Sequence, residues 1–279
     1  MASSPARILK HFIVLLLGGA VVYLVVTQVF PFFDDRTPLA LALFATYLVT
    51  AYLVIPLAFR LFRLFYQPIH LPLYCTTPDG FASDPVNIAL IGGRRQVILA
   101  MEAAEWHRAD RKTLLSVVHQ VVYAVLKRSY PNAPVSSLYL FGRTQDLAFQ
   151  KEIPGSRGHR HHVRFWAADD ALANEFSKRQ VQFWKRFRRR NSRRADTGFW
   201  VGAASKDIGF SLIRHNAQIT HLVHPNTRRE RLLIARDLRR AGKLAGSRTM
   251  PAYRPVSLRN RAWRARLLSD GHVTICELK

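Results

Sequence analysis

Two long apolar stretches lie near the start of the chain. Residues 12–30 contain no charged side chain, and residues 39–59 form a second uncharged run. Nineteen residues span about 28 Å as a helix, close to the ~30 Å hydrocarbon core of a bilayer. The pattern predicts a membrane hairpin over residues 1–64. A cleaved signal peptide is the alternative, but its apolar run is shorter and no second span follows it.

The basic residues around the two spans predict an orientation. Arg7 and Lys10 precede the first span, and Arg60 and Arg63 follow the second. The connector between the spans carries two aspartates and a single arginine. Basic flanks stay on the cytoplasmic side of a membrane. We therefore expect both termini in the cytoplasm and the short acidic turn outside.

The remaining sequence predicts one mixed domain. Residues 65–83 are expected to be a linker, and residues 84–279 contain no repeat or low-complexity divider. Two adjacent helices followed by a run of strands favour an α+β fold over a doubly wound parallel sheet. Helices are expected over residues 97–104, 114–125 and 227–240. Strands are expected over residues 86–92, 136–142, 146–152, 161–167, 198–205, 218–224 and 273–278.

Composition narrows the classes of partner. The chain has 42 Lys and Arg against 18 Asp and Glu, a net charge of +24, and 49% of its residues are hydrophobic. A chain of this kind folds, and its charge favours an acidic partner such as lipid or nucleic acid. Cys75 and Cys276 form no CxxC pair, which excludes a disulfide scaffold and a zinc ribbon.

The basic segment 175–194 contains nine basic residues and one acid. As a helix it places four aromatic rings, Phe176 among them, on one face and basic side chains on the rest. Such a helix is suited to an anionic membrane surface. Nucleic acid is less favoured, because a tether holds the domain at high effective lipid concentration. A surface helix that packs its apolar side on its own domain is the remaining alternative. The expected membrane-contacting residues are Phe183, Trp184, Lys185, Arg186, Phe187, Arg188 and Arg189.

Histidines cluster in two of the predicted strands. His161, His162 and His221, with Asp207, are the candidates for a catalytic group or a metal site. Three such ligands with an open position would suit zinc or another first-row metal that activates water. The spacing matches no HExxH motif, so hydrogen-bonded structural histidines are the alternative. The sequence requires no cofactor.

Arginines share this region with the histidines. Guanidinium groups bind phosphate oxygens in a bidentate manner, and histidine can assist them. A pocket for a phosphate or carboxylate group is therefore expected. Solvated arginines that pair with Asp146 or Glu230 are the alternative. The candidate pocket residues are Arg143, Arg160, His161, His162, Arg164, His221 and Arg231.

Several segments resemble one known family. They are DPVNIALIG (84–92), AAEWHRAD (103–110), APVSSLYLFGRTQDLAFQK (133–151), HRHHVRFW (159–166), FWVGAAS (199–205) and ITHLVHPNTRRER (219–231). Together they resemble the LssY C-terminal domain family, bacterial domains of unknown biochemical function. Members are sometimes found next to type 2 phosphatidic-acid phosphatase or DedA-like membrane domains. The resemblance implies a multi-pass protein of the bacterial inner membrane.

These features predict a membrane-anchored cytosolic domain that binds anionic ligands. A phospholipid headgroup or a lipid-linked phosphate is expected, in an accessory or regulatory role in the cell envelope. The first alternative is a hydrolase that acts on a phosphate-bearing substrate through the His/Asp cluster, with or without a divalent metal. The lipid-phosphatase signatures KxxxxxxRP, PSGH and SRxxxxxHxxxD are absent. The second alternative is a scaffold that contacts a membrane transporter or phosphatase.

Overall fold

The computed structural model describes most of the 279 residues. The helix expected over residues 114–125 lies outside the described residues, as does Phe176. The chain divides into two compact units, an N-terminal helical unit and a sheet-rich unit. The described residues are 5–58, 73–78, 81–110, 113, 130, 132–153, 159–168, 178–191, 198–213, 219–259 and 266–279.

The helical unit contains the two apolar runs. Its first helical run consists of α1 (Pro5–Leu24), a π-helical turn η1 (Val25–Val29) and α2 (Phe30–Asp34). Its second consists of α3 (Leu39–Val49) and a π-helical turn η2 (Thr50–Val54), and continues to Ala58. Both runs are long and apolar enough to cross a membrane, with a mean hydropathy of 2.0. The unit therefore has the helices of a membrane anchor.

The connector is a tight turn with satisfied backbone groups. Thr37 Oγ1 donates to the carbonyl of Phe33 at 2.9 Å, and Arg36 Nη1 donates to that of Phe32 at 2.6 Å. The carbonyl of Pro38 accepts from the amides of Leu41 and Ala42, which starts α3. The carbonyl of Phe33 also accepts from the amides of Arg36 and Thr37, so side-chain and backbone donors together satisfy this helix end.

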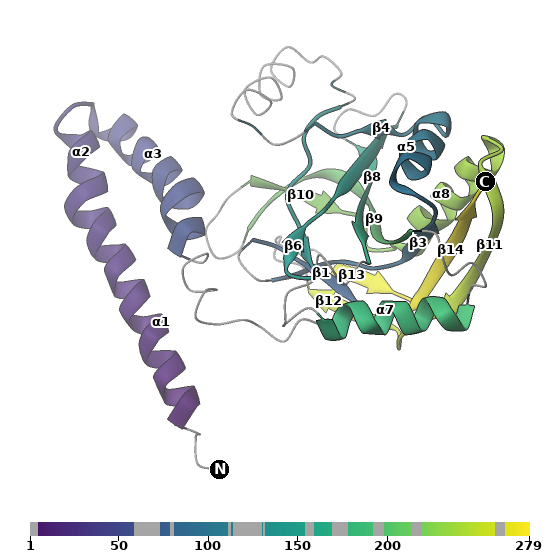
Figure 1. Cartoon of the computed structure of the whole chain (residues 1–279). Helices are drawn as coiled ribbons and strands as arrows, with labels where there is room; N and C mark the ends of the chain where they lie inside the picture. The colour runs from purple at the N-terminus through teal and green to yellow at the C-terminus, as the bar shows by residue number, and fades with distance from the viewer. Residues whose placement is uncertain are drawn as a thin grey trace. The chain divides into compact units, whose positions relative to one another are not determined.

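An eight-stranded sheet forms the centre of the second unit (Figure 1). The strand order is β11-β14-β3-β9-β8-β7-β4, and β10 pairs with β9. Along this path β14 pairs with β3 in parallel, and the other neighbouring strands pair antiparallel. Helices and sheet together confirm the α+β class. The strands are β3 (Ile88–Ile91), β4 (His107–Arg108), β7 (Leu147–Glu152), β8 (Arg160–Ala167), β9 (Phe199–Leu212), β10 (Ile219–Val223), β11 (Leu244–Pro251) and β14 (His272–Leu278).

Two smaller sheets accompany the central one. One has the order β2-β1-β5-β6, and the other pairs β12 with β13. Strand β1 lies within the segment expected to be a linker, and its Cys75 is fully buried. The compact unit therefore begins before residue 84. The strands are β1 (Tyr74–Thr76), β2 (Ala82–Pro85), β5 (Tyr139–Leu140), β6 (Arg143–Thr144), β12 (Val256–Arg259) and β13 (Arg266–Ser269).

The strand expected over residues 136–142 is instead the start of a hairpin. Phe141 and Gly142 form a two-residue loop between β5 and β6, with φ of 56° and 74°. Positive φ at both loop residues matches the right-handed twist of the flanking strands. Phe141 is buried in spite of its place in a turn. Its apolar ring makes the turn look like strand in the sequence.

Helices cover both faces of the central sheet. Helices α5 (Arg94–Ala103) and α8 (Arg228–Arg240) pack on the face that carries Val163 and Phe165. Helix α7 (Lys178–Asn191) lies on the other face (Figure 1). Its apolar side chains pack there with Trp166 and Val201. Successive side chains of a strand point to opposite faces. Strands β3, β8, β9 and β14 therefore contribute to two separate cores.

Gly202 allows close packing at the centre of the sheet. A Cβ atom at this position would lie 2.6 Å from the Phe165 ring and 2.8 Å from Ile88 Cγ2. Both neighbours are fully buried and have no room to move. Only glycine fits here, because the two side chains cross over its backbone.

The aromatic side of α7 faces the protein, which corrects one expectation. Val181 and Trp184 are fully buried, Phe187 is buried, and Phe183 packs partly against the same core. The Trp184 ring makes edge contacts with Phe183 at 5.1 Å and Phe187 at 5.5 Å between centroids. Trp184 and Phe187 are therefore unavailable to a membrane, and Phe183 is only partly exposed. The alternative in which the helix packs on its own domain is the one observed.

Replacement of Trp184 by Ala tests this packing. We expect a loss of about 3–5 kcal/mol in the free energy of unfolding, because a fully buried indole leaves a cavity. Urea denaturation of the full chain in detergent, followed by near-ultraviolet circular dichroism, measures it. Arg189→Ala on the exposed side of α7 is the control, with a change within about 0.5 kcal/mol. Equal stability of the two variants would contradict the packing.

Candidate functional site

Strands β8 and β9 bring charged side chains together on the α7 face of the sheet. Arg160 lies opposite Asp207, and His162 lies opposite Ser205. Arg164 follows on the same face, since it is two residues further along β8. Two antiparallel strands thus place these five polar residues side by side. His162, Arg164, Ser205 and Asp207 are buried.

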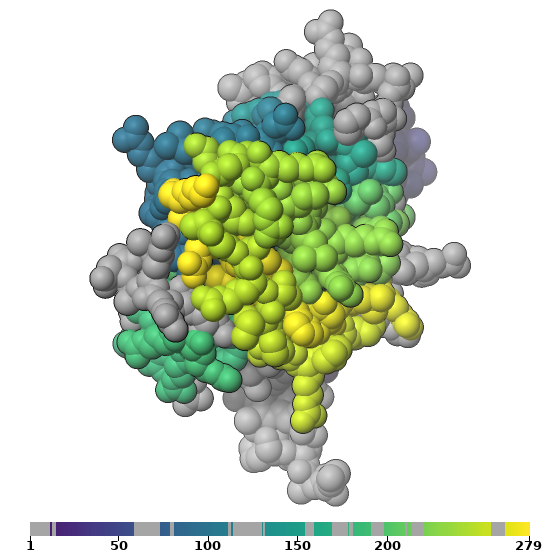
Figure 2. All heavy atoms as spheres, turned by 90° about the vertical axis from the view of Figure 1, so that its right-hand side faces the viewer, coloured from purple at the N-terminus to yellow at the C-terminus, as the bar shows by residue number. Residues whose placement is uncertain are grey.

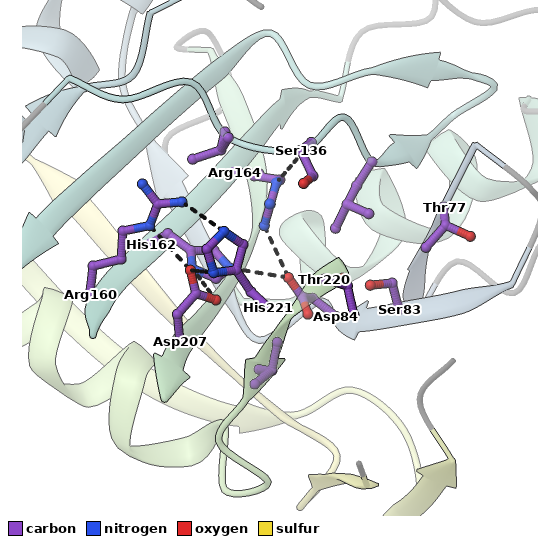
Figure 3. A pocket seen from close by; sticks show the side chains of 13 residues that line it. Thr77, Ser83, Asp84, Ser136, Arg160, His162, Arg164, Asp207, Thr220 and His221 are labelled. Atoms are coloured by element: carbon purple, nitrogen blue, oxygen red, sulfur yellow. Dashed lines mark hydrogen bonds and ion pairs between the residues drawn. The ribbon is translucent and has the colours of Figure 1, made fainter. Parts of the chain in front are cut away.

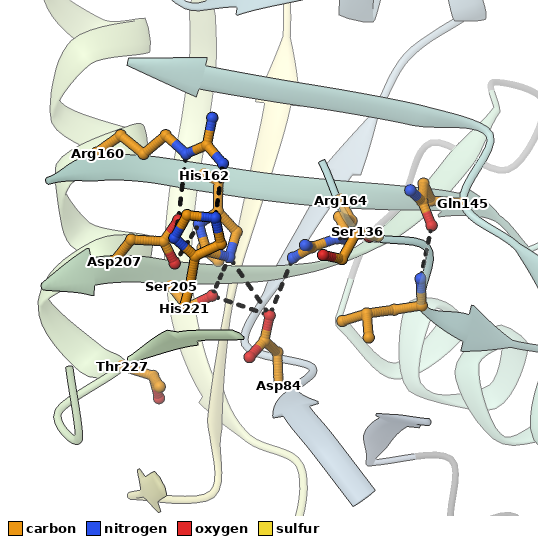
Figure 4. Close-up of polar contacts among 12 residues, drawn as sticks. Asp84, Ser136, Gln145, Arg160, His162, Arg164, Ser205, Asp207, His221 and Thr227 are labelled. Carbon is orange, nitrogen blue, oxygen red and sulfur yellow. Dashed lines mark hydrogen bonds and ion pairs between the residues drawn. The ribbon is translucent and has the colours of Figure 1, made fainter. Parts of the chain in front are cut away.

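Asp84 receives three groups at one end of this row (Figure 4). Arg164 Nη1 donates to Asp84 Oδ2 at 3.1 Å, and Ser205 Oγ donates to the same oxygen at 2.9 Å. His162 Nε2 lies 2.7 Å from Ser205 Oγ and 3.6 Å from Asp84 Oδ2. Arg164 Nε also donates to the carbonyl of Ser136 at 3.1 Å. Asp84 therefore ties the end of β2 to both strands.

Asp207 holds the other end of the row. His162 Nδ1 lies 3.4 Å from Asp207 Oδ1, and Arg160 Nε donates to Oδ2 at 3.2 Å. His221 Nδ1 lies 3.7 Å from the same Oδ2, so β10 also reaches this carboxylate. Arg160 Nη1 donates to Gln150 Oε1 at 2.8 Å. Positive and negative groups alternate along the row from Arg164 to Arg160.

The neighbouring charges set the protonation of the row. Burial by itself raises the pKa of Asp84, but a hydrogen bond from His162 and the charge of Arg164 outweigh it, so the pKa is lowered. Burial likewise raises the pKa of Asp207, and His162 outweighs it, so that pKa lies well below its usual value. Burial by itself lowers the pKa of His162. The charge of Asp207 outweighs this effect, so the pKa is raised above the ordinary 6.5. Two carboxylates thus favour the protonated form of this imidazole.

His221 has the opposite tendency. Burial lowers its pKa, and although Asp207 opposes this effect, the positive charges of Arg160, His162 and Arg164 add to it. Its pKa is therefore below 6.5, and the ring is neutral at neutral pH. The two histidines of the cluster thus carry different charges at the same pH.

A protonated His162 limits the chemistry of Ser205. Both ring nitrogens of an imidazolium donate, so Nε2–H donates to Ser205 Oγ and Ser205 donates to Asp84. A general base must instead accept the proton of the nucleophile. With His162 protonated, Ser205, His162 and Asp207 share the order of a catalytic triad but not its direction of proton donation.

A small polar cavity adjoins the row (Figure 3). Its volume is about 50 Å³. This is room for a few water molecules, whereas drug-sized ligands occupy about 300–1,000 Å³. Besides the charged groups, four hydroxyl side chains line it, those of Thr77, Ser83, Ser136 and Thr220. The cavity fits water better than a headgroup.

The structure brings together only part of the expected phosphate pocket. Arg160, His162, Arg164 and His221 line the cavity. His161 points to the opposite face of the sheet, where its Nδ1 lies 2.5 Å from Glu230 Oε2. Adjacent residues on a strand cannot share a face.

Two further arginines of the expected pocket have partners elsewhere. Arg143 pairs with Asp146, and its Nη2 donates to the carbonyl of Ala167 at 2.6 Å. Arg231 is buried and makes a bidentate pair with Asp270, both bonds 2.7 Å long. These contacts make the two arginines links between structural elements and not parts of a phosphate pocket.

The expected metal ligands gather incompletely. His162, Asp207 and His221 meet, whereas His161 lies on the other face. Across the described ranges, no group of three or more His, Cys, Asp or Glu side chains is arranged to hold a metal ion. Cys75 and Cys276 are fully buried, and burial raises the pKa of Cys276 to about 12. Neither thiol has the accessible thiolate that metal binding requires.

Two members of the row were absent from the expected set. Asp84 and Ser205 contact His162 from β2 and β9. Alternation along β9 places Ser205 beside Asp207, and this pattern was available in the sequence. Asp84 is a lone acid before an apolar strand, and no local pattern links it to the histidines. Only the fold reveals its role.

The dependence of stability on pH tests the charge of His162. A raised folded pKa contributes stability that is complete below the unfolded pKa of 6.5 and is lost as pH rises through the folded pKa. Each pKa unit corresponds to about 1.4 kcal/mol. The pKa values of Asp84 and Asp207 are lowered instead of raised. The stability that these two carboxylates contribute is therefore lost only in acid. We expect stability to fall as the pH rises above 6.5, and His162→Gln to remove much of that fall.

Chemical denaturation of the full chain at several pH values measures this effect. His107→Gln is the matched control, because His107 is an exposed histidine of the same sheet. An unchanged pH dependence in His162→Gln would show that the imidazole is neutral in the folded protein.

Comparison with known proteins assigns a family. The model of the family described as LssY C-terminus matches residues 68–273. No curated protein and no solved structure matches the chain. The match covers most of the chain and the whole row from Asp84 to His221. This chain belongs to the LssY C-terminal domain family.

Proposed function

We propose that this chain is a protein of the bacterial inner membrane whose sheet-rich domain binds the anionic leaflet through α7, in an accessory or regulatory role. The supporting observation is the charge of the outer side of α7. Lys178, Arg186, Arg189 and Arg190 are exposed there, and the helix carries no acidic residue. Such a surface attracts anionic headgroups.

The charges of this surface are largely uncompensated. Arg186, Arg189 and Arg190 have no ion-pair partner among the residues that the structure describes. Each basic residue near an anionic leaflet contributes about 1 kcal/mol, so these three arginines would contribute about 3 kcal/mol. A tethered domain needs no larger free energy of binding, because the lipid is already at high effective concentration.

The contact is electrostatic and does not insert rings into the bilayer. Trp184 and Phe187 are buried in the domain, so only the cationic side of α7 is available. A contact of this kind weakens with salt. The Debye length falls from about 10 Å at 0.1 M to about 3 Å at 1 M.

The buried row is less suited to bind the anion. Asp84 and Asp207 offset two of its three cations, Arg160, Arg164 and His162. The adjoining cavity of about 50 Å³ is also too small for a headgroup. A phosphate there would have to displace carboxylates that are already hydrogen-bonded.

The hydrolase alternative has less support. Two carboxylates lie beside His162, and its pKa is raised above 6.5, which favours the protonated ring. A protonated ring cannot accept the proton of Ser205. Ser205 itself is fully buried and already donates to Asp84. These contacts favour a structural role for the row.

Fluorescence transfer to lipid tests the membrane contact. Gln182 is exposed on α7, and both native cysteines are buried, so Gln182→Cys accepts a dye selectively. The full chain is placed in nanodiscs with dye-labelled lipid, so that transfer reports on α7. Simple binding to a bilayer would not, because the apolar helices would associate with any bilayer. We expect stronger transfer with anionic than with neutral lipid, and a loss of this difference at high salt.

The triple variant Arg186→Gln, Arg189→Gln, Arg190→Gln should abolish the difference. The matched control removes three positive charges elsewhere in the domain, Lys206→Gln, Arg229→Gln, Arg236→Gln, and should retain it. Equal transfer with neutral and anionic lipid in the parent protein would exclude α7 as a lipid contact.

Reporter fusions test the proposed orientation. The basic residues Arg7, Lys10, Arg60 and Arg63 are proposed to hold both termini in the cytoplasm. A fluorescent protein fused after Lys279 should fluoresce, and alkaline phosphatase inserted after Thr37 should be active. The reverse pattern would place the domain outside the cytoplasm and remove the proposed lipid contact.

A further inference from the structure

An open groove lies along the N-terminal half of α8, on the face of the sheet opposite α7. Its volume is about 500 Å³, within the range of small-molecule sites. Lys206 of β9 lines one side, and Arg229 and Arg236 of α8 line the other. Figure 2 shows the outer side of α8 in lime, with α7 in green at the lower left.

The cations of the groove are poorly compensated. Lys206 and Arg229 have no ion-pair partner within the described part of the chain. Arg236 Nε lies 3.6 Å from Asp237 Oδ1. The other oxygen of Asp237 already accepts from Lys151 Nζ at 3.1 Å and from Trp106 Nε1 at 3.2 Å. Asp237 therefore neutralises Arg236 only in part.

The one acid that lines the groove is withdrawn from it. Glu230 is buried, and its Oε2 lies 2.5 Å from His161 Nδ1. The carboxylate makes Nδ1 the protonated nitrogen of this ring. The pair leaves the positive charges of the groove dominant.

A histidine adds a further donor. His224 Nδ1 accepts from the amide of Asn226 at 3.1 Å, so the ring proton lies on Nε2. Lys206, Arg229, Arg236 and His224 therefore bring ammonium, guanidinium and imidazole donors to one groove. This donor set matches a phosphate dianion.

The groove also has an apolar wall. Leu232 lines it and is 43% exposed, and Leu233 lines it beside Leu232. An exposed leucine next to cations suits a ligand with an anionic group and an organic substituent. We propose that this groove binds the phosphate group of a soluble phosphate monoester, with the ester's organic part against Leu232.

The proposed membrane contact of α7 is the reason to infer a water-soluble phosphate ester as the ligand of the groove. Helices α7 and α8 cover opposite faces of the sheet, so a domain that rests on α7 presents the groove to the aqueous phase. A lipid phosphate is the other source of the same chemistry. The phosphate site itself does not depend on the membrane contact.

Titration calorimetry of the full chain in phosphatidylcholine nanodiscs tests the site, with empty nanodiscs as the blank. The soluble probes are inorganic phosphate and phenyl phosphate, and nanodiscs that contain phosphatidic acid form the lipid arm. We expect phenyl phosphate to bind more tightly than inorganic phosphate. Phosphatidic acid in the disc should not compete with phenyl phosphate. Competition would assign the groove to lipid and overturn the soluble source.

Variants separate the groove from general charge. Lys206→Gln, Arg229→Gln, Arg236→Gln should weaken both soluble probes at least tenfold, while Leu232→Ala should weaken phenyl phosphate alone. The α7 triple variant has the same change in net charge and should bind within twofold of the parent. Equal losses in both triple variants, or no binding by the parent at millimolar phosphate, would overturn the proposal. Failure of the α7 contact leaves phosphate binding unchanged, so the two outcomes are distinguishable.

Discussion

The buried ion pairs around His162 are the constraint on which the sheet-rich unit depends. Asp84, His162 and Asp207 alternate in charge, and Arg164 and Arg160 close the two ends. Removing these groups from water is costly unless every charge meets a partner. The row meets that condition only when β2, β8 and β9 adopt one register, so it specifies how the strands align. A one-residue slip of β8 would turn three cations into the α5 and α8 core.

The alternation of side chains along β8 and β9 gives the two faces of the sheet different roles. His161 and His162 are neighbours in the chain, yet one pairs with Glu230 beside the groove and the other lies between two aspartates. On one face of β8 and β9, two carboxylates thus offset two of the three cations, whereas the outer sides of α7 and α8 keep positive charge. Burial of Glu230 and Asp237 contributes to this separation, because it removes acids from the surface of α8.

The sequence predicted periodic elements well and long-range pairing poorly. The apolar helices, β8, β10 and α8 follow from local pattern, and the family follows from the motifs. The position of α7 could not be predicted from local pattern. An amphipathic helix has the same sequence pattern whether its aromatic rings contact lipid or a protein core. Trp184 was therefore expected at a membrane and is found buried. The contact of Asp84 with His162 joins residues 78 positions apart, so no local periodicity could reveal it.

The place of β14 has a consequence for biogenesis. This last strand lies between β11 and β3, and it pairs in parallel with a strand formed almost two hundred residues earlier. The interior of the sheet is therefore incomplete until β14 has been translated. The apolar N-terminal helices emerge from the ribosome long before that moment. The anchor is then available for insertion while the globular unit is still unfinished, and loss of β14 would prevent its completion.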